Sequence, residues 1–159
     1  MTLQQFFMTL EALPVSNFIR SSAWLGAMIN VAHIVCLVML AGCVLIVDIR
    51  MMGGGLKRQP VAQVAREARP WMIAALIAMV LTGVPQVLST AMKQYYSPFF
   101  WQKMEFLIVA VIYTFTVKWR VSIADEARTG RLWPALVALV SIGLWMAAAI
   151  NARMIGLLS

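Results

Sequence analysis

Four long apolar stretches constrain this chain more than any other feature of its sequence. They cover residues 22–47, 71–91, 101–119 and 132–150. Each is about 20 residues long, which is the length at which an α-helix crosses the hydrocarbon core of a bilayer. Tryptophans stand near their boundaries, as in the aromatic belts of membrane proteins: Trp24, Trp71, Trp101, Trp119 and Trp133. The sequence therefore predicts an all-α integral membrane four-helix bundle, a single domain over residues 1–159 that contacts the lipid bilayer.

The composition agrees with a membrane protein and argues against a nucleic-acid-binding one. Of the 159 residues, 62% are hydrophobic and 12% are charged. Soluble domains carry roughly 25% charged residues. The net charge of +7 is not gathered on a soluble module and does not alternate with aromatic residues, so we expect no nucleic-acid partner.

The basic residues predict how the chain is oriented in the membrane. They gather in the two connections that join the first span to the second and the third to the fourth: Arg50, Lys57, Arg58, Arg66 and Arg69, then Lys118, Arg120, Arg128 and Arg131. Connections rich in Lys and Arg stay in the cytoplasm. We therefore expect a multi-pass protein of the bacterial inner membrane with both termini in the periplasm.

Shorter elements are expected outside the spans. Near the N-terminus, apolar residues recur at helical spacing and predict a short amphipathic helix on the membrane, ended by Pro14, with a disordered tail as the alternative. After the glycines 53–55, a second helical pattern over residues 61–68 predicts a short cytoplasmic surface helix. The chain is expected to turn into the second span at Pro70, and residues 93–103 are expected to form an aromatic outer loop.

His33 is the only histidine, and it lies in the outer half of the first span. Ionisable residues inside spans are costly and tend to face a bundle interior or a pocket. It shares one helical face with Asn30, Cys36, Leu40 and Cys43. An imidazole there can ligate haem iron or copper; the alternative is a neutral histidine hydrogen-bonded between helices.

Three residues on other spans are expected at the depth of His33. Gln86 follows Pro85, where a kink is expected. Lys103 lies in the first turn of the third span, where a cation opposes the helix dipole and indicates an anionic partner, such as a propionate, a lipid phosphate or Glu105. The alternative for Lys103 is snorkelling to the interface. Trp145 is too deep for an interfacial belt and would pack against a helix, a flat cofactor or a quinone ring.

One acidic residue lies at the opposite end of the first span. Asp48 falls in the last turn of that helix, where a negative charge opposes the helix dipole. We therefore expect it to pair with a basic residue of a neighbouring helix or loop, in a structural role.

Three strings of the sequence resemble a branch of small bacterial four-span membrane proteins: AHIVCLVMLAGCVLIVDIRMMG, RPWMIAALIAMVLTGVPQVL and SPFFWQKMEFLIVAVIYTF. That pattern is similar to the copper-resistance D (CopD) proteins and, more distantly, to the HemJ-type membrane protoporphyrinogen oxidases. The resemblance implies a b-type haem, with His33 as its ligand and Lys103 as the accompanying lysine. Asn30 departs from the pattern, because the branch often has an acid there.

These features predict a protein that binds haem b near its periplasmic side and exchanges electrons with a quinone or a partner protein. The expected cofactor-binding residues are His33, Gln86, Lys103 and Trp145, with His33 as the metal ligand and copper as the alternative metal. Such a protein would be a component of a haem- or quinone-linked oxidoreductase. One histidine cannot supply two axial imidazoles, so we expect a homodimer or a larger membrane complex. The alternative function is a non-catalytic accessory or copper-handling subunit without a redox cofactor.

Overall fold

The computed structural model describes residues 2–55, 58–124, 130 and 132–158. Two short helices, α1 (Leu3–Glu11) and α2 (Pro14–Ser21), come before the spans. The spans are α3 (Ala23–Met51), α4 (Val61–Ser89), the third span and α9 (Leu132–Leu158). The third span is built from α6 (Pro98–Tyr113), the π-helix η1 (Thr114–Lys118) and α7 (Trp119–Ile123), and α5 (Ala91–Tyr96) comes before it.

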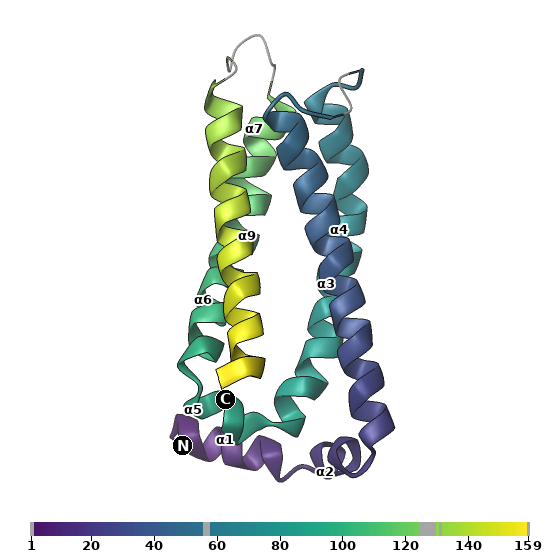
Figure 1. The fold of residues 1–159 in the computed structure, drawn as a ribbon, viewed down its shortest axis with the longest axis vertical. Helices are drawn as coiled ribbons and strands as arrows, with labels where there is room; N and C mark the ends of the chain where they lie inside the picture. The colour runs from purple at the N-terminus through teal and green to yellow at the C-terminus, as the bar shows by residue number, and fades with distance from the viewer. Residues whose placement is uncertain (1, 56–57, 125–129, 131, 159) are drawn as a thin grey trace.

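The four long helices run side by side as two pairs (Figure 1). α3 packs along α4 and α6 packs along α9, while α3 also touches α9 and α4 touches α7. All four are long and apolar enough to cross a membrane, which confirms the predicted all-α, multi-pass bundle. Both termini lie at one end of the bundle, called here the terminal end. The opposite end, where α3 leads to α4 and α7 leads to α9, is the loop end.

Two of the three buried hydrophobic clusters lie in the loop-end half of the bundle. They join α3 to α4 and α9: Val47, Met51, Val61, Val64, Ala65, Ala68, Val137 and Ala138 in one, and Leu40, Val44, Met72, Ala75 and Met79 in the other. The third, of Phe7, Ala91 and Phe100, lies at the terminal end. In the terminal-end half, by contrast, no residue over 23–39 of α3 or 80–89 of α4 is buried. The two helix pairs are thus packed together at the loop end and diverge toward the terminal end (Figure 1).

The second span differs from the prediction. α4 begins at Val61 and continues without interruption through Pro70, so the expected surface helix and turn were wrong. A proline inside a helix removes one backbone hydrogen bond and crowds the preceding turn. Here the apolar face of residues 61–68 is buried against Val47 and Met51 of α3, and this packing keeps the segment in line with the rest of the helix.

The terminal end carries more helix than predicted. The N-terminal amphipathic helix is confirmed as α1, so the disordered alternative was wrong. Pro14 does not simply end it but occupies the first turn of α2, because its fixed φ suits that position. The expected outer loop over residues 93–103 was also wrong, since α5 and α6 cover most of it. We call α1, α2 and α5 together the terminal cap.

Aromatic packing holds the terminal cap against the third span. The Phe7 ring of α1 is buried, with its centroid 5.3 Å from that of Tyr95 and 6.5 Å from that of Phe100. The Trp101 ring completes the group at 6.0 Å from Phe7. The cap is therefore part of the packed protein, and α1 does not rest on lipid alone.

Candidate functional site

His33 faces α4 and forms one hydrogen bond across the interface between the two helices. Its Nδ1 lies 2.9 Å from Thr82 Oγ1, and Thr82 Oγ1 lies 2.8 Å from the carbonyl oxygen of Ala78. Thr82 Oγ1 also lies 3.2 Å from the carbonyl oxygen of Met79. A hydroxyl has one proton to donate, so the roles of Thr82 and His33 follow from the imidazole tautomer. When Nδ1 carries the ring proton, Thr82 accepts it and Nε2 is unprotonated.

The imidazole lies close beside the residue that follows Thr82. A Cβ atom built on Gly83 would lie 3.2 Å from His33 Cε1 and 3.6 Å from Nδ1, so a larger residue there would crowd the ring. Glycine inside a helix costs roughly 0.5–1 kcal/mol relative to alanine. The local sequence Thr82-Gly83 therefore supplies both a hydrogen-bond partner for the ring and room beside it.

Lys103 lies on α6, a helix that has no extended contact with α3. It occupies the second turn of α6, because that helix begins at Pro98. It shares a helical face with the buried residues Phe100 and Ala110, so it is on the packed side of α6. Lys103 is half-buried and forms no ion pair with Glu105 or with any other described residue. Its ammonium is thus a cation without a counterion on the inner side of α6.

The other two predicted site residues lie elsewhere around the bundle interior. The Gln86 Nε2 atom on α4 is buried and has no hydrogen-bond partner among the residues that the structure describes. The Trp145 indole of α9 donates to Thr114 Oγ1 at 3.1 Å and packs against the Leu40 cluster. No hydrogen bond joins either residue to His33 in the described part of the chain. No hydrogen bond joins Lys103 to His33 among these residues either, and the structure gives Trp145 a packing role between α9 and η1.

A second polar cluster lies in the loop-end half, where sequence reasoning found only one of its members. Lys118 was assigned to a cytoplasmic connection, which was wrong: its side chain is 2% exposed. Its Nζ lies 2.8 Å from Asp48 Oδ1, and Ser141 Oγ donates to Asp48 Oδ2 at 2.9 Å. The expected pairing of Asp48 with a basic residue of another helix is thus confirmed. We call Asp48, Lys118 and Ser141 the buried ion-pair cluster.

The surroundings of the Lys118 ammonium explain how a charge can be placed in this core. Besides Asp48, it donates to the carbonyl oxygen of Val44 at 3.1 Å and lies 3.3 Å from Ser141 Oγ. Burying a charge costs several kcal/mol unless it is paired and hydrogen-bonded. Here the pair is neutral as a unit, and it links α3 to the third span and to α9.

The donor set limits what the chain can bind by itself. No group of three or more His, Cys, Asp or Glu residues that could hold a metal ion occurs in the described part of the chain. Cys36 and Cys43 are both free thiols on α3. A ligand that needs only one or two donors from the protein suits this site better than a bare ion that needs three or four.

The chain was compared with known families, curated proteins and solved structures. The profile of DUF6644, described as a family of unknown function, matches residues 22–158, which covers all four spans. No curated protein and no solved structure matches the chain.

Proposed function

The chain belongs to the DUF6644 family, and we propose that it binds b-type haem through His33 in the terminal-end half of the bundle. In this proposal the protein lies in the bacterial inner membrane with both termini in the periplasm. When bound, the haem supplies a one-electron redox centre, and the electron partner is a quinone or another protein. The chain is then a component of a haem- or quinone-linked oxidoreductase.

The contact between His33 Nδ1 and Thr82 Oγ1 is the observation that carries the proposal. A histidine that ligates a metal normally donates its other ring N–H to a nearby acceptor, which fixes the tautomer and the ring orientation. The Thr82 hydroxyl, 2.9 Å from Nδ1, is suited to that role, and Nε2 is then the nitrogen that would bind the iron.

The donor set favours haem over a bare metal ion. A porphyrin brings four nitrogen ligands of its own, so a single imidazole can hold it through the iron. A bare ion held by His, Cys, Asp or Glu side chains needs more of these donors than the described residues bring together. Lys103, a half-buried cation without a described counterion, is suited to a carboxylate such as a haem propionate.

A second imidazole ligand for the iron would come from a second copy or a different protein, because the chain has one histidine. We expect a homodimer or a subunit of a larger complex. If the purified protein binds no haem, that result would favour the alternative function, an accessory or copper-handling subunit.

Substitutions of Thr82 test the observation on which the proposal rests. Thr82→Val removes the acceptor for His33 Nδ1–H, and mutations of such partners cost roughly 10–100-fold in metal affinity. We expect haem affinity in detergent to fall within that range and the reduction potential to shift. Thr82→Ser keeps the hydroxyl and should behave as wild type. Equal loss in both variants, or no loss in either, would show that the hydroxyl does not orient the ligand.

The orientation of the bundle is tested separately. Basic residues gather at the loop end, which by the positive-inside rule is the cytoplasmic side. Reporter fusions at Gly54 and at the C-terminus should therefore show opposite locations, the first cytoplasmic and the second periplasmic. A cytoplasmic C-terminus would contradict the topology and would move His33 to the inner half of the membrane.

A further inference from the structure

The space around His33 is closed toward the loop end. The two buried clusters and the buried ion-pair cluster fill that half of the bundle. In the terminal-end half, α3 from residue 23 to 39 and α4 from residue 80 to 89 bury no residue. A molecule in contact with His33 therefore does not reach it through the loop end.

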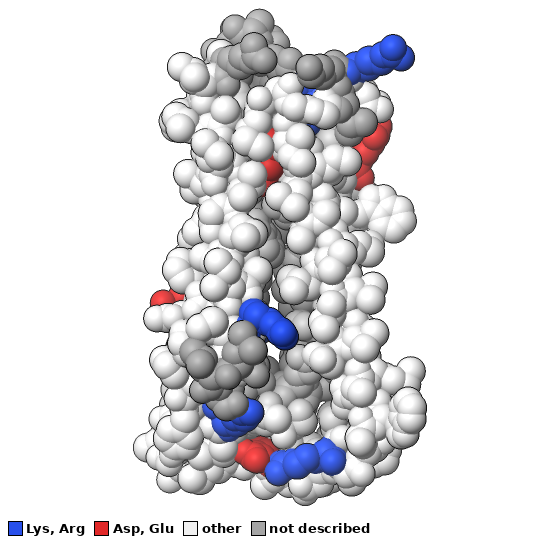
Figure 2. Space-filling model, viewed as in Figure 1, with Lys and Arg blue, Asp and Glu red and all other residues white. Residues whose placement is uncertain are grey.

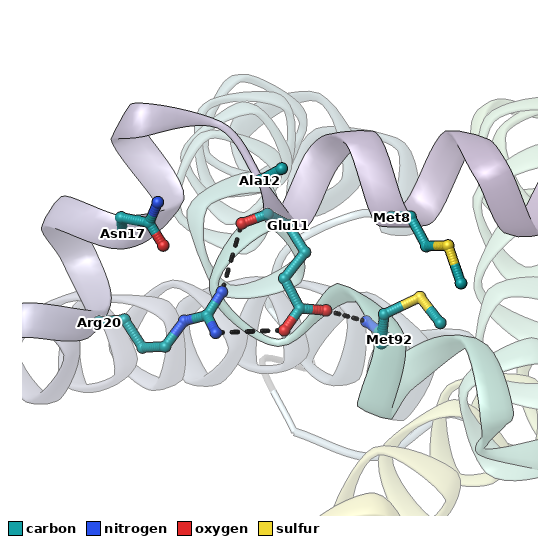
Figure 3. Close-up of a pocket in the computed structure, with 6 residues that line it drawn as sticks. All are labelled: Met8, Glu11, Ala12, Asn17, Arg20 and Met92. Atoms are coloured by element: carbon teal, nitrogen blue, oxygen red, sulfur yellow. Dashed lines mark hydrogen bonds and ion pairs between the residues drawn. The ribbon is translucent and has the colours of Figure 1, made fainter.

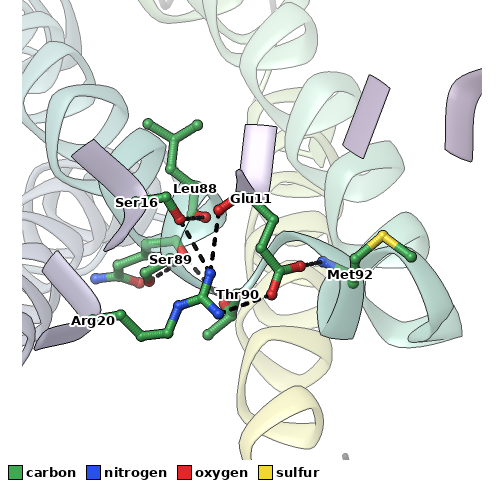
Figure 4. A network of polar contacts seen from close by, with 8 residues as sticks. Glu11, Ser16, Arg20, Leu88, Ser89, Thr90 and Met92 are labelled. Atoms are coloured by element: carbon green, nitrogen blue, oxygen red, sulfur yellow. Dashed lines mark hydrogen bonds and ion pairs between the residues drawn. The ribbon is translucent and has the colours of Figure 1, made fainter. Parts of the chain in front are cut away.

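The terminal cap closes the described part of the opposite end. The Glu11 carboxylate binds the Arg20 guanidinium at 3.2 Å and accepts from the backbone N–H of Met92 at 2.9 Å, so one side chain ties α1 to α2 and α5 (Figure 3). Ser16, which is fully buried, donates to the Leu88 carbonyl at the end of α4 (Figure 4). The shallow pocket beside these contacts, about 360 Å³, is lined by Glu11, Arg20 and Met92 together with Met8, Ala12 and Asn17. The cap is thus fastened to the bundle at several points.

The remaining route to His33 is through the side of the bundle, between the two helix pairs. Figure 2 shows a hollow on the side face of the bundle, between the α3–α4 pair and the α6–α9 pair, in the terminal-end half. Since these four helices are long and apolar enough to span a membrane, that face borders hydrocarbon. Only a molecule dissolved in the bilayer can approach through such an opening.

We propose that this cleft takes a carboxylate-bearing amphiphile from the bilayer, with Lys103 and Gln86 holding its carboxylate. Two donors on helices that flank the cleft have no partner among the described residues: the Lys103 ammonium on α6 and the Gln86 Nε2 on α4. An apolar body fits the unfilled space between the helix pairs, and a carboxylate supplies the acceptors that these donors lack. Haem and fatty acids share this chemistry. The proposal that the ligand is haem rests on the proposed function, whereas the proposal that the cleft prefers a carboxylate does not.

Photolabelling in nanodiscs tests the preference of the cleft for a carboxylate without relying on haem. The probe is a diazirine-bearing palmitic acid in the bilayer, and its methyl ester is the matched control. The acid should label the terminal-end halves of the spans. Lys103→Met should reduce that labelling about tenfold, as expected for the loss of a charge-assisted hydrogen bond. Lys103→Arg should retain most of it, and Lys93→Met, at an exposed cation of α5, should leave it unchanged. Equal labelling by acid and ester, or no effect of Lys103→Met, would overturn the proposal.

A second experiment, with haemin, distinguishes the two ligands that could carry the carboxylate, a fatty acid and haem. Haemin and its dimethyl ester are added to the same nanodiscs, and binding is followed by absorption. We expect the ester to bind about tenfold more weakly, for the same reason. If the fatty acid binds and haemin does not, the carboxylate site stands and the proposed function fails. If haemin and its ester bind equally well through His33, the proposed function stands and the carboxylate site fails.

One further variant tests whether ligands enter through the side of the bundle. Glu11→Ala removes both contacts that the carboxylate makes within the terminal cap. If ligands enter from the bilayer, the rate of haemin or fatty-acid uptake should stay within about twofold of wild type, because the cap does not lie on the route. An acceleration of tenfold or more would show entry through the terminal end and would overturn the sideways route.

Discussion

Replacing Lys118 with methionine should lower the free energy of unfolding by about 3–5 kcal/mol. The substitution keeps the length of the side chain but leaves the Asp48 carboxylate buried, fully shielded from solvent and without its counterion. It also removes the donor to the Val44 carbonyl. The measurement is reversible unfolding in mixed detergent micelles, followed by circular dichroism. Arg120→Met, at an exposed basic residue of the next helical turn, is the control and should change the free energy by less than about 1 kcal/mol.

The double variant Asp48→Leu with Lys118→Met distinguishes a charge effect from lost packing. Replacing a whole buried ion pair with apolar side chains is often neutral or stabilising by about 1–4 kcal/mol. We therefore expect the double variant to recover most of the stability lost by Lys118→Met. If the double variant is as unstable as the single one, the ion pair is not what the single substitution disrupts, and the assigned role of the buried ion-pair cluster is wrong.

The second large effect concerns His33. Replacing it with alanine should reduce haem content by at least about tenfold, because the variant lacks the imidazole that we propose as the axial ligand. Insertion into the membrane should be unaffected, since alanine is readily accommodated in a membrane helix. Haem content is measured from the Soret absorption per mole of purified protein. Cys36→Ala, a change at a half-buried residue one turn along the same face of α3, is the matched control and should retain the haem.

A different result would identify the structural alternative. If His33 only joins α3 to α4 through Thr82, the alanine variant should lose about 0.6–2 kcal/mol of stability, the usual size of an interhelical hydrogen bond in a membrane. It would then show no spectral change relative to wild type. Measuring stability and absorption on the same preparation separates the two roles.

The sequence was sufficient to predict the bundle because the signal for a span is its length and apolarity. Prediction was less successful at the ends of helices, where the outcome depends on packing between segments. Pro70 is a normal signal for a helix end, yet α4 continues through it because residues on its N-terminal side are buried against α3. Local rules do not include such contacts, and for the same reason α2 was missed.

The candidate site also contains some residues that the sequence identifies and others that it does not. His33 was identifiable because a lone histidine in an apolar helix is costly, and Asp48 because an acid at a helix end opposes the dipole. Thr82 and Ser141 have no comparable signal, since a single hydroxyl in a span can satisfy itself with its own backbone. Lys118 was misassigned because it lies among basic residues near the end of a span, and only the π-helix and the buried Asp48 reveal its position. Partners on other helices are visible only once the packing is known.

The most direct test of haem binding is the absorption spectrum of the wild-type protein, purified from bacterial membranes in a mild detergent and then titrated with haemin. Haem binding through His33 predicts a Soret band that sharpens to saturation at one haem or fewer per chain, with α and β bands on reduction. Protein with no haem as purified, and with no spectral change beyond that of free haemin in detergent, would contradict it and leave the accessory or copper-handling subunit as the better interpretation.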